Sequence, residues 1–476
     1  MKRNTALLQA LVGLLLCLAL VIDPHFVSAQ SYDLPQKVIA GGGNTGTSGG
    51  NLQISGTVGQ SAAGAPLSGG PFTQTGGFWQ AIEGLPSSLP AVQLNASAYT
   101  VAEGAAQLLI TLSRSNNTGA AMSARLATFD AGASQSCNAV SGVASARCDY
   151  LASIRTVSFA AGETSRVVAV SIIDDSYLEG TEIFNVSVSD PAGLQSSATV
   201  TIIDNESATG PNPIDLTGPF VRLQYLDFLN REPDASGFNF WTSQITSCGN
   251  DVQCLEARRI NVSAAFYLSI EFQETGFLVE RLYRAAYGSE AGNSTLGGPH
   301  QLAVPIVRFH EFLSDTQEIG DGVIVKAPGW EAALEANKQA FIAGFVERSR
   351  FVTKYPSSMT AAQFVDALNA NAGGALSQLE RDQLVNDLSS GMKTRAQALR
   401  TIAEDSDLFN AEFTRAFVLM EYFGYLRRNP NDAPESDHSG YEFWLNKLNQ
   451  FNGDFINAEM VKAFISSAEY RRRFGP

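Results

Sequence analysis

The sequence predicts a multidomain protein in which an all-β sandwich is followed by an all-α domain of helical repeats. Residues 92–204 consist of short, β-branched, alternating segments separated by turn residues. From residue 220 onward, apolar residues recur at spacings of three and four, and one motif occurs more than once. The chain has 476 residues, which is enough for about three domains of ~100–200 residues each.

The first 29 residues (1–29) are typical of a cleaved signal peptide. Lys2 and Arg3 form a basic start, residues 6–22 are mostly apolar, and small side chains precede a cleavage site near Ala29. The apolar run is short for a bilayer span of about 20 residues. We therefore predict a secreted protein, extracellular or in the cell envelope, with no transmembrane segment in the mature chain.

Residues 30–84 predict a small Gly/Ser-rich β module at the N-terminus. The stretch "NLQISGTVGQ" alternates apolar and polar residues, and "FTQTGGFWQ" supplies aromatic residues next to glycines. This pattern is typical of short strands joined by tight turns. The stretch "LPSSLP" at 85–90 favours a hinge between this module and the next domain.

Four cysteines follow the signal peptide, and they form two close pairs in the sequence, Cys137 with Cys148 and Cys248 with Cys254. Four cysteines allow three disulfide connectivities, and the sequence does not choose among them. The simplest assignment in an oxidising compartment is two local loops, one for each pair. Neither pair has the CxxC spacing of a zinc site, and the histidines lie far away in the sequence, so we expect no zinc site.

The composition is acidic, with a net charge of −15. A surface poor in lysine argues against nucleic acid and anionic lipid as partners. It is compatible with a secreted protein that meets divalent cations.

The stretch "IIDDSYLEGTE" at 172–182 places four carboxylates directly after an apolar strand. Because like charges repel and strands disfavour Asp and Glu, packing alone does not explain this cluster. The last predicted strand also ends in an acid, Asp204, in "VTIIDNE". If both strand ends lie at one pole of the sandwich, their loops supply the oxygen ligands that calcium prefers, and the cation removes the repulsion.

Residues 91–206 resemble a Calx-beta domain, the calcium-binding module of sodium–calcium exchangers that also occurs in extracellular proteins. The resemblance rests on "VAEG", "RCDY", "VSFAAGETSRVVAVSIIDDSYLEGTEIFNVSVSDPAG" and "ATVTIID", which occur in the order of the family. It implies an immunoglobulin-like sandwich with a calcium site. The ligands that it implies are Glu103, Asp149, Asp174, Asp175, Glu179 and Asp204.

The sequence departs from the exchanger pattern after the last strand. The exchanger site has a run of acids there, whereas Asn205 follows Asp204 in this chain. Fewer charges imply weaker binding, at about 10⁻⁴–10⁻³ M as in extracellular modules. We expect Glu182 to face solvent or to pair with an arginine. The alternative is that these acids serve turns and solubility and bind no metal.

The helical region repeats one motif. The stretch "YLDFLNREPDASGFNFW" (225–241) is echoed by "YFGYLRRNPNDAPESDHSGYEFW" (422–444), and each is followed by a second similar stretch, "AFYLSIEF" or "AFISSAEY". A degenerate copy lies between them, so one helical unit is reused along the chain. The predicted boundaries are a linker at 207–218 and a helical domain at 219–476 with repeats at 219–272, 279–351 and 415–470.

These repeats resemble domain of unknown function 4214 (DUF4214), which occurs in bacterial surface and S-layer-like proteins. The resemblance covers about residues 219–475. Its motif residues have structural explanations, since Tyr225 fits a helix core and Asp234 can cap the next helix. Phe240 and Trp241 are expected to pack that helix back against the first.

We predict a non-enzymatic, calcium-binding protein of the cell surface or matrix that mediates adhesion through contacts with surface proteins or polysaccharides. No nucleophile–base pair, zinc signature or phosphate loop stands out in the sequence. One alternative is a secreted polysaccharide-modifying or hydrolytic enzyme with a site in 219–475, where Glu271, Glu412 or Glu469 could act. Another is a structural spacer.

Overall fold

The computed structural model describes residues 42–49, 52–58, 67–69, 72–74, 91–115, 118–133 and 135–476. The predicted signal peptide, its cleavage site near Ala29 and the hinge at 85–90 lie outside the described residues. The chain divides into two units, Met1–Ser87 and Ser88–Pro476. The first contains two antiparallel hairpins, formed by β1 (Gly42–Gly49) with β2 (Leu52–Val58) and by β3 (Leu67–Gly69) with β4 (Phe72–Gln74).

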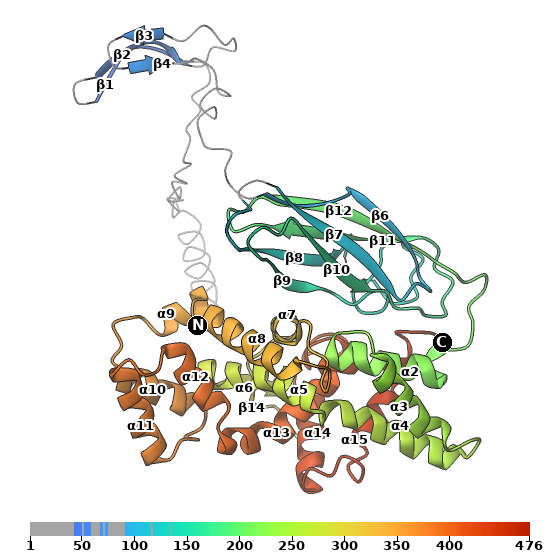
Figure 1. Ribbon diagram of the computed structural model, residues 1–476. Coiled ribbons are helices and arrows are strands. Elements are labelled where there is room, and N and C mark those ends of the chain that lie inside the picture. The colour runs from blue at the N-terminus through green and yellow to red at the C-terminus, as the bar shows by residue number, and fades with distance from the viewer. Residues whose placement is uncertain are drawn as a thin grey trace, which may run out of the picture. The chain divides into compact units, whose positions relative to one another are not determined.

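Strands β5 to β12 form the predicted all-β sandwich of two sheets (Figure 1). One sheet has the strand order β10–β7–β5, and the other has the order β6–β12–β11–β8–β9. Neighbouring strands are antiparallel except β6 and β12, which run parallel. The strands are β5 (Ala91–Leu94), β6 (Ala98–Ala102), β7 (Gln107–Ser115), β8 (Met122–Asp130), β9 (Ile154–Phe159), β10 (Ser165–Ser171), β11 (Glu182–Ser189) and β12 (Gln195–Ile203).

The sandwich core follows from the alternation along each strand. Successive side chains point to opposite faces of a sheet, so every second residue can face the other layer. Leu108, Ile110 and Leu112 of β7 are buried in this way, and so are Val186 and Val188 of β11. These side chains belong to one apolar cluster between the two sheets.

The remainder of the second unit is helical and packs around an apolar core of its own (Figure 1). Its helices and helical turns are η2 (Pro213–Asp215), α2 (Thr217–Gln224), η3 (Tyr225–Leu229), α3 (Ala235–Thr246), α4 (Val252–Tyr267), α5 (Ile270–Glu274), α6 (Gly276–Tyr287), α7 (Phe309–Gly320), α8 (Trp330–Phe345), α9 (Ser349–Lys354), α10 (Ala361–Asn371), α11 (Gln378–Ser389), α12 (Arg395–Ala403), α13 (Ser406–Glu421), η4 (Tyr422–Leu426), α14 (Ser439–Gln450), α15 (Met460–Ile465) and α16 (Ala468–Arg471).

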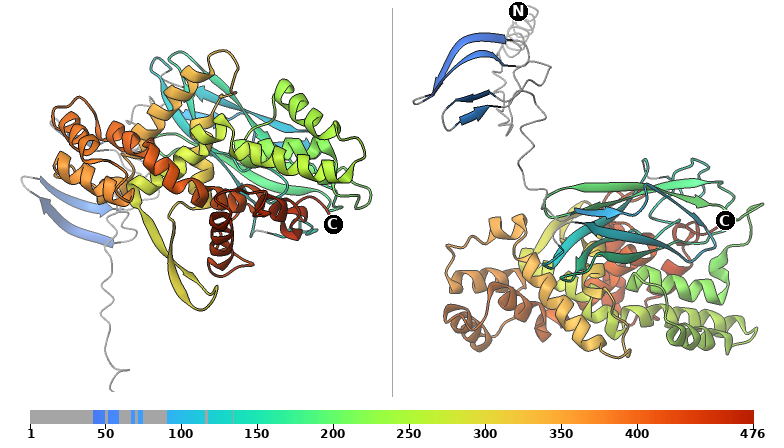
Figure 2. Two further views of the ribbon diagram at one scale, coloured as in Figure 1. Left: turned by 90° about the horizontal axis from the view of Figure 1, so that it is seen from below. Right: turned by 45° about the horizontal axis from the view of Figure 1, so that its top comes forward.

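Two features of this region were not predicted. A hairpin of β13 (Ser289–Ser294) and β14 (His300–Pro305) follows α6 and extends from the helices (Figure 2). It occurs in the degenerate middle copy, where the first copy instead enters α3. In addition, the range predicted as a linker contains η2, and Ile214 in this turn is buried in the helical core.

The first and last copies of the motif fold alike. Each has a π-helical turn, η3 or η4, which ends at a residue in the left-handed region, Asn230 or Arg427, both with φ of 54°. The predicted cap of the next helix is confirmed in the first copy, where Asp234 accepts a hydrogen bond from the amide of Gly237 at 2.8 Å. Phe240, however, is 53% exposed and does not pack back as expected.

In the first and the last copy, a bidentate ion pair links the first stretch of the motif to the second. Arg231 donates to both carboxylate oxygens of Glu271 at 2.6 and 2.8 Å. At the equivalent positions, Arg428 donates to both oxygens of Glu469 at 2.7 and 2.9 Å. Such fork-to-fork geometry fixes orientation as well as charge. Each glutamate lies in the second stretch of its copy, so the pair joins segments about 40 residues apart, as the separations of 40 and 41 show.

Two disulfides confirm the simplest pairing of the cysteines. Cys137 bonds to Cys148 with a Cα–Cα distance of 5.7 Å, and Cys248 bonds to Cys254 with a distance of 5.6 Å. Of the helices in the described ranges, none has both the length and the apolar character required to cross a membrane.

Candidate metal centre

Several acid-bearing segments meet at one pole of the sandwich. Strands β6 and β12 run parallel with Ala102 opposite Ile203, so Glu103 and Asp204 follow at the same level. The amide of Glu103 donates to the carbonyl of Ile203 at 3.0 Å, which continues this pairing. Glu182 is the first residue of β11 and pairs with the end of β12, so it lies at the same pole.

The segment after β10 and the loop closed by the first disulfide bring further acids to this pole. The amide of Ile173 donates to the carbonyl of Asp149 at 2.9 Å, so the two segments lie side by side. The amide of Asp175 then donates to a carboxylate oxygen of Glu103 at 3.1 Å. Acids from positions that are distant in the sequence are therefore neighbours in the structure.

These acids form two groups that are compact enough to hold a cation. In each group, one carboxylate oxygen from every member lies within 4.8 Å of the others. The groups are Glu103, Asp204 and Glu206, and Asp149, Asp175 and Glu179. The structure thus brings five of the six expected ligands together. Asp174 belongs to neither group; it is exposed and accepts a hydrogen bond from Asn205 at 3.1 Å.

Two buried carboxylate oxygens in the second group have no hydrogen-bond partner among the described residues. Asp149 uses Oδ2 to accept from the amide of Ser145 at 2.6 Å, but its Oδ1 has none. Asp175 uses Oδ1 to accept from the amide of Tyr177 at 2.7 Å, but its Oδ2 has none. The two aspartates are 6% and 4% exposed. Buried polar atoms normally have partners, so these oxygens fit ligand positions for a cation.

Burial, reinforced by the neighbouring carboxylates, raises the pKa of most acids at this pole. It raises the pKa of Glu103 to about 8, of Asp175 to about 9 and of Glu179 to about 10. Burial likewise raises the pKa of Asp149 and of Glu182, whose carboxyl groups are neighbours. Protonation is the way in which a crowded group of acids relieves its repulsion without a cation.

Asp204 behaves differently because backbone amides surround it. Burial acts to raise its pKa, but hydrogen bonds from the amides of Glu206, Gly180 and Glu179 outweigh burial and lower it. Its oxygens accept from the amides of Glu179, Gly180 and Glu206 at 2.9, 2.6 and 2.7 Å. This carboxylate is held ionised and oriented at the junction of the two groups.

The expectation for Glu182 was wrong, and Glu206 was missed. Glu182 is 5% exposed and lies beside Asp149 instead of facing solvent or pairing with an arginine. The signal was present in β11, where Glu182 is in phase with the buried residues Phe184 and Val186. Glu206 supplies an acid one position after Asn205. It partly offsets the loss of negative charge that we inferred from that asparagine.

The donor set at this pole favours a hard cation. Within the described part of the chain, no arginine, lysine or histidine forms an ion pair with any of these acids. The ligand groups are carboxylates from segments next to the strand ends, and oxygen donors of this kind are the donor chemistry of calcium sites. The acids therefore fit the expected calcium, whose charge would compensate theirs.

The carboxylates that we considered for a hidden enzyme have other partners. Glu271 and Glu469 accept the bidentate hydrogen bonds described above. Glu412 accepts from Arg284 at 2.8 Å and lies 3.1 Å from Arg415. Each carboxylate thus holds helices of the array together.

Comparison with known families agrees with this organisation. Residues 88–206 match the Calx-beta domain family, and residues 215–275 match a domain of unknown function, DUF4214. The predicted order of the two domains is confirmed. The second match covers the first helical copy, and the later copies lie outside it. No curated protein matches the chain.

Solved structures to which part of the chain is similar include the following. The apo-form Calx CBD1 domain is 22% identical, with 24% of this chain and 96% of that chain covered and a TM-score of 0.21. The calcium binding domain CBD12 of CALX1.1 is 21% identical, with 24% of this chain and 46% of that chain covered and a TM-score of 0.21. The E. coli chaperone DraB is 11% identical, with 27% and 62% covered and a TM-score of 0.18.

Proposed function

We propose that the protein is a secreted calcium-binding protein and that its calcium site is the acidic pole of the sandwich. The observation that carries the proposal is the pair of unpartnered, buried oxygens, Asp149 Oδ1 and Asp175 Oδ2. The match of this segment to the Calx-beta family, whose members include calcium-binding domains, supports it. The proposed ligands are Glu103, Asp149, Asp175, Glu179, Asp204 and Glu206, with Asp174 and Glu182 adjacent.

Calcium at this pole would stabilise the sandwich. The proposed ligands follow strands of both sheets and the disulfide loop, so a shared cation would link segments that are otherwise held by few direct bonds at this pole. A ligand that binds only the folded state raises the free energy of unfolding by RT ln(1 + [L]/Kd). The sandwich should therefore be more stable in calcium than in a chelator.

Calorimetry and thermal melting of matched variants test the site. Asp175→Asn keeps the oxygen that accepts from Tyr177 and replaces the unpartnered oxygen by an amide. Glu163→Gln is the control, because Glu163 precedes β10 whereas Asp175 follows it. We expect a Kd of about 10⁻⁴–10⁻³ M for the wild type and the control, and loss of binding in the aspartate variant. Absence of calcium heats in the wild type, with equal melting in EDTA and millimolar calcium, would contradict the proposal.

We further propose a non-enzymatic role at the cell surface or in the matrix, in contacts with surface proteins or polysaccharides. The arginine pairing of Glu271, Glu412 and Glu469 supports a structural role for the helical array. A pull-down on intact envelopes, with and without calcium, tests the contacts. Turnover on a panel of glycans and esters would contradict the non-enzymatic assignment.

A further inference from the structure

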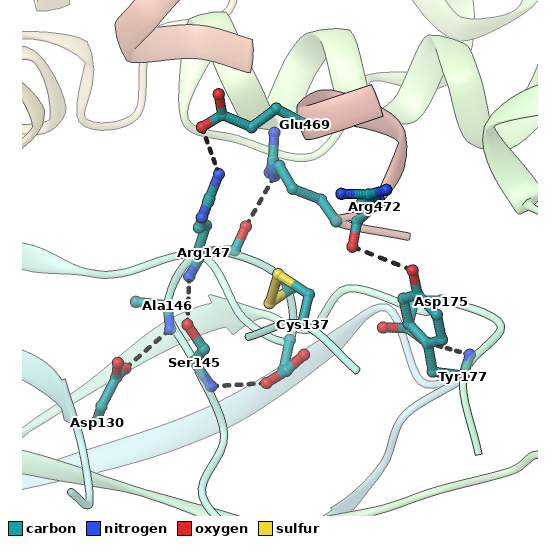
Figure 3. The surroundings of a disulfide bond; sticks show 12 residues. Asp130, Cys137, Ser145, Ala146, Arg147, Asp175, Tyr177, Glu469 and Arg472 are labelled. Atoms are coloured by element: carbon teal, nitrogen blue, oxygen red, sulfur yellow. Dashed lines mark hydrogen bonds and ion pairs between the residues drawn. A yellow bond between two sulfur atoms is a disulfide. The ribbon is translucent and has the colours of Figure 1, made fainter. Parts of the chain in front are cut away.

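The disulfide loop of the sandwich carries a candidate calcium ligand and a contact with the helical domain two residues apart. The side chain of Arg147 donates to Glu469 of the last helical copy at 2.7 Å (Figure 3). The backbone carbonyl of Arg147 accepts a hydrogen bond from Nε of Arg473 at 2.8 Å. Asp149 follows, with Cys148 between them tied into the disulfide. A change in the position of Asp149 therefore acts on the helical contact through a short, constrained backbone.

The loop after β10 has the same arrangement. Ile173 is 2% exposed and belongs to the apolar core of the helical domain. The hydroxyl of Ser176 donates to the carbonyl of Phe474 at 3.1 Å. The hydroxyl of Tyr177 donates to the carbonyl of Arg472 at 3.3 Å (Figure 3). The proposed ligand Asp175 lies between these contact residues in the sequence. Ile173 is two positions before it, and Ser176 and Tyr177 follow it directly.

The segment that receives these contacts is itself held firmly by the helical domain. Arg473 is 1% exposed and donates to both oxygens of Asp227 at 3.0 and 3.1 Å. It also donates to the carbonyl of Tyr425 at 2.9 Å. The carbonyls of Arg472 and Phe474 are therefore fixed acceptors, and the conformation of the sandwich loops decides whether the contacts form.

We propose that calcium binding at the acidic pole and docking of the sandwich on the last helical copy are thermodynamically linked. The inference rests on the proposed function, because it assumes that calcium orders these two loops. Without calcium, these carboxyl groups take up protons or repel one another, and neither state ties the two loops together as a shared cation would. Linkage is reciprocal: if calcium strengthens docking by some factor, the docked state binds calcium more tightly than the undocked state by the same factor. A variant that shifts the chain toward the undocked state therefore binds calcium more weakly, by up to that factor.

The two helical copies provide a matched pair of variants. Glu469→Gln disturbs the pair with Arg428 and also the contact with Arg147 of the sandwich. Glu271→Gln disturbs the equivalent pair with Arg231, and no sandwich residue contacts it among the described side chains. Calorimetric titration of the full chain with calcium should give a Kd about fivefold or more weaker for the first variant. The second variant should remain within about twofold of the wild type.

A second variant covers the case in which Glu469→Gln does not fold. Arg147→Met removes only the sandwich side of the contact and leaves Glu469 paired with Arg428, and it should weaken calcium binding in the same direction. Hydrogen exchange gives a readout that does not depend on affinity. Calcium should slow amide exchange in residues 468–476 of the wild type but not of Asp175→Asn.

The outcomes separate this proposal from the calcium site on which it rests. Calcium heats with equal Kd values in the wild type, Glu469→Gln and Arg147→Met would overturn the linkage and leave the site intact. Equal weakening in Glu469→Gln and Glu271→Gln would also overturn it, because a general effect on the helical array would then be responsible. No calcium heat in the wild type would overturn both.

Discussion

Arg473 and Asp227 form a buried ion pair between positions that are 246 residues apart, with Nη2 and Oδ1 separated by 3.0 Å and both side chains 1% exposed. Removing one partner of such a pair leaves a charge without compensation in the core. We therefore expect Asp227→Asn to lower the free energy of unfolding by about 3–5 kcal/mol.

Urea denaturation measures this effect, and an exposed pair provides the control. Asp366 pairs with Arg381 at 2.7 Å, but its side chain is 54% exposed. Asp366→Asn should change the free energy of unfolding by less than about 1 kcal/mol, because water screens such pairs. Equal losses in the two aspartate variants would contradict the assigned role of burial.

Glu421 predicts a pH dependence of stability within the helical domain. Its side chain is 1% exposed, one of its oxygens has no partner, and burial raises its pKa well above the usual range. A raised pKa in the folded state contributes stability that is complete below the unfolded-state pKa and is lost as the pH rises toward the folded-state pKa. The wild type should therefore lose up to about 1.4 kcal/mol per pH unit relative to Glu421→Gln.

Denaturation of both proteins in EDTA at pH 5, 6, 7 and 8 checks this prediction. The comparison removes the titration of the acidic pole, because that pole is common to the two proteins. The stability difference between them should grow steadily in favour of the glutamine variant. A difference that is constant with pH would show that Glu421 keeps the same protonation in the folded and unfolded states.

The two disulfides should differ in their effect on calcium binding. Cys148 immediately precedes the proposed ligand Asp149, whereas Cys248 and Cys254 close a loop between α3 and α4. Replacing Cys137 and Cys148 by serine should lower the free energy of unfolding by about 2–3 kcal/mol and also weaken calcium binding. Replacing the other pair should leave the calcium Kd unchanged. Calorimetry decides, and equal Kd values in the two double variants would contradict the prediction.

Glu182 should contribute to calcium affinity although it lies outside both compact groups. It is buried beside Asp149, so it would add a negative charge next to the unpartnered oxygen once a bound cation displaces its proton. We expect Glu182→Gln to weaken calcium binding severalfold. The control Glu163→Gln should not weaken it, because Glu163 precedes β10 and the acidic pole lies at the other end of that strand. An unchanged Kd in a calorimetric titration of the first variant would show that Glu182 is protonated in the bound state.

The sequence predicted most of the fold because local patterns specify it. Alternation identified the strands of the sandwich, and self-similarity identified the helical copies. The hairpin of β13 and β14 was not predicted, because "SEAGNSTLGGPHQLAVP" (289–305) has few apolar residues and no regular alternation. Phe240 was misplaced for a related reason, since an aromatic residue on an amphipathic helix can face a groove as well as a core.

The sequence predicted the site less completely, because several acids belong to it only through the register of strands. Asp174 and Asp175 are adjacent in the sequence, yet only Asp175 is buried and in a compact group. The pairing of β11 with β12 brings Glu182 to the pole, and such pairing is not visible in a single segment. The docking of Arg147 on Glu469 joins positions 322 residues apart, which no local pattern encodes.

The contacts of Arg472 and Phe474 with the sandwich have a consequence for folding during synthesis. The sandwich strands end at Ile203, so about 270 further residues must be synthesised before this docking segment exists. At ~5–20 residues per second, the ribosome needs on the order of tens of seconds for that length. During this interval the core that buries Leu151 and Ile173 in the finished protein is incomplete, so the nascent sandwich passes through a stage in which this apolar face is not fully covered.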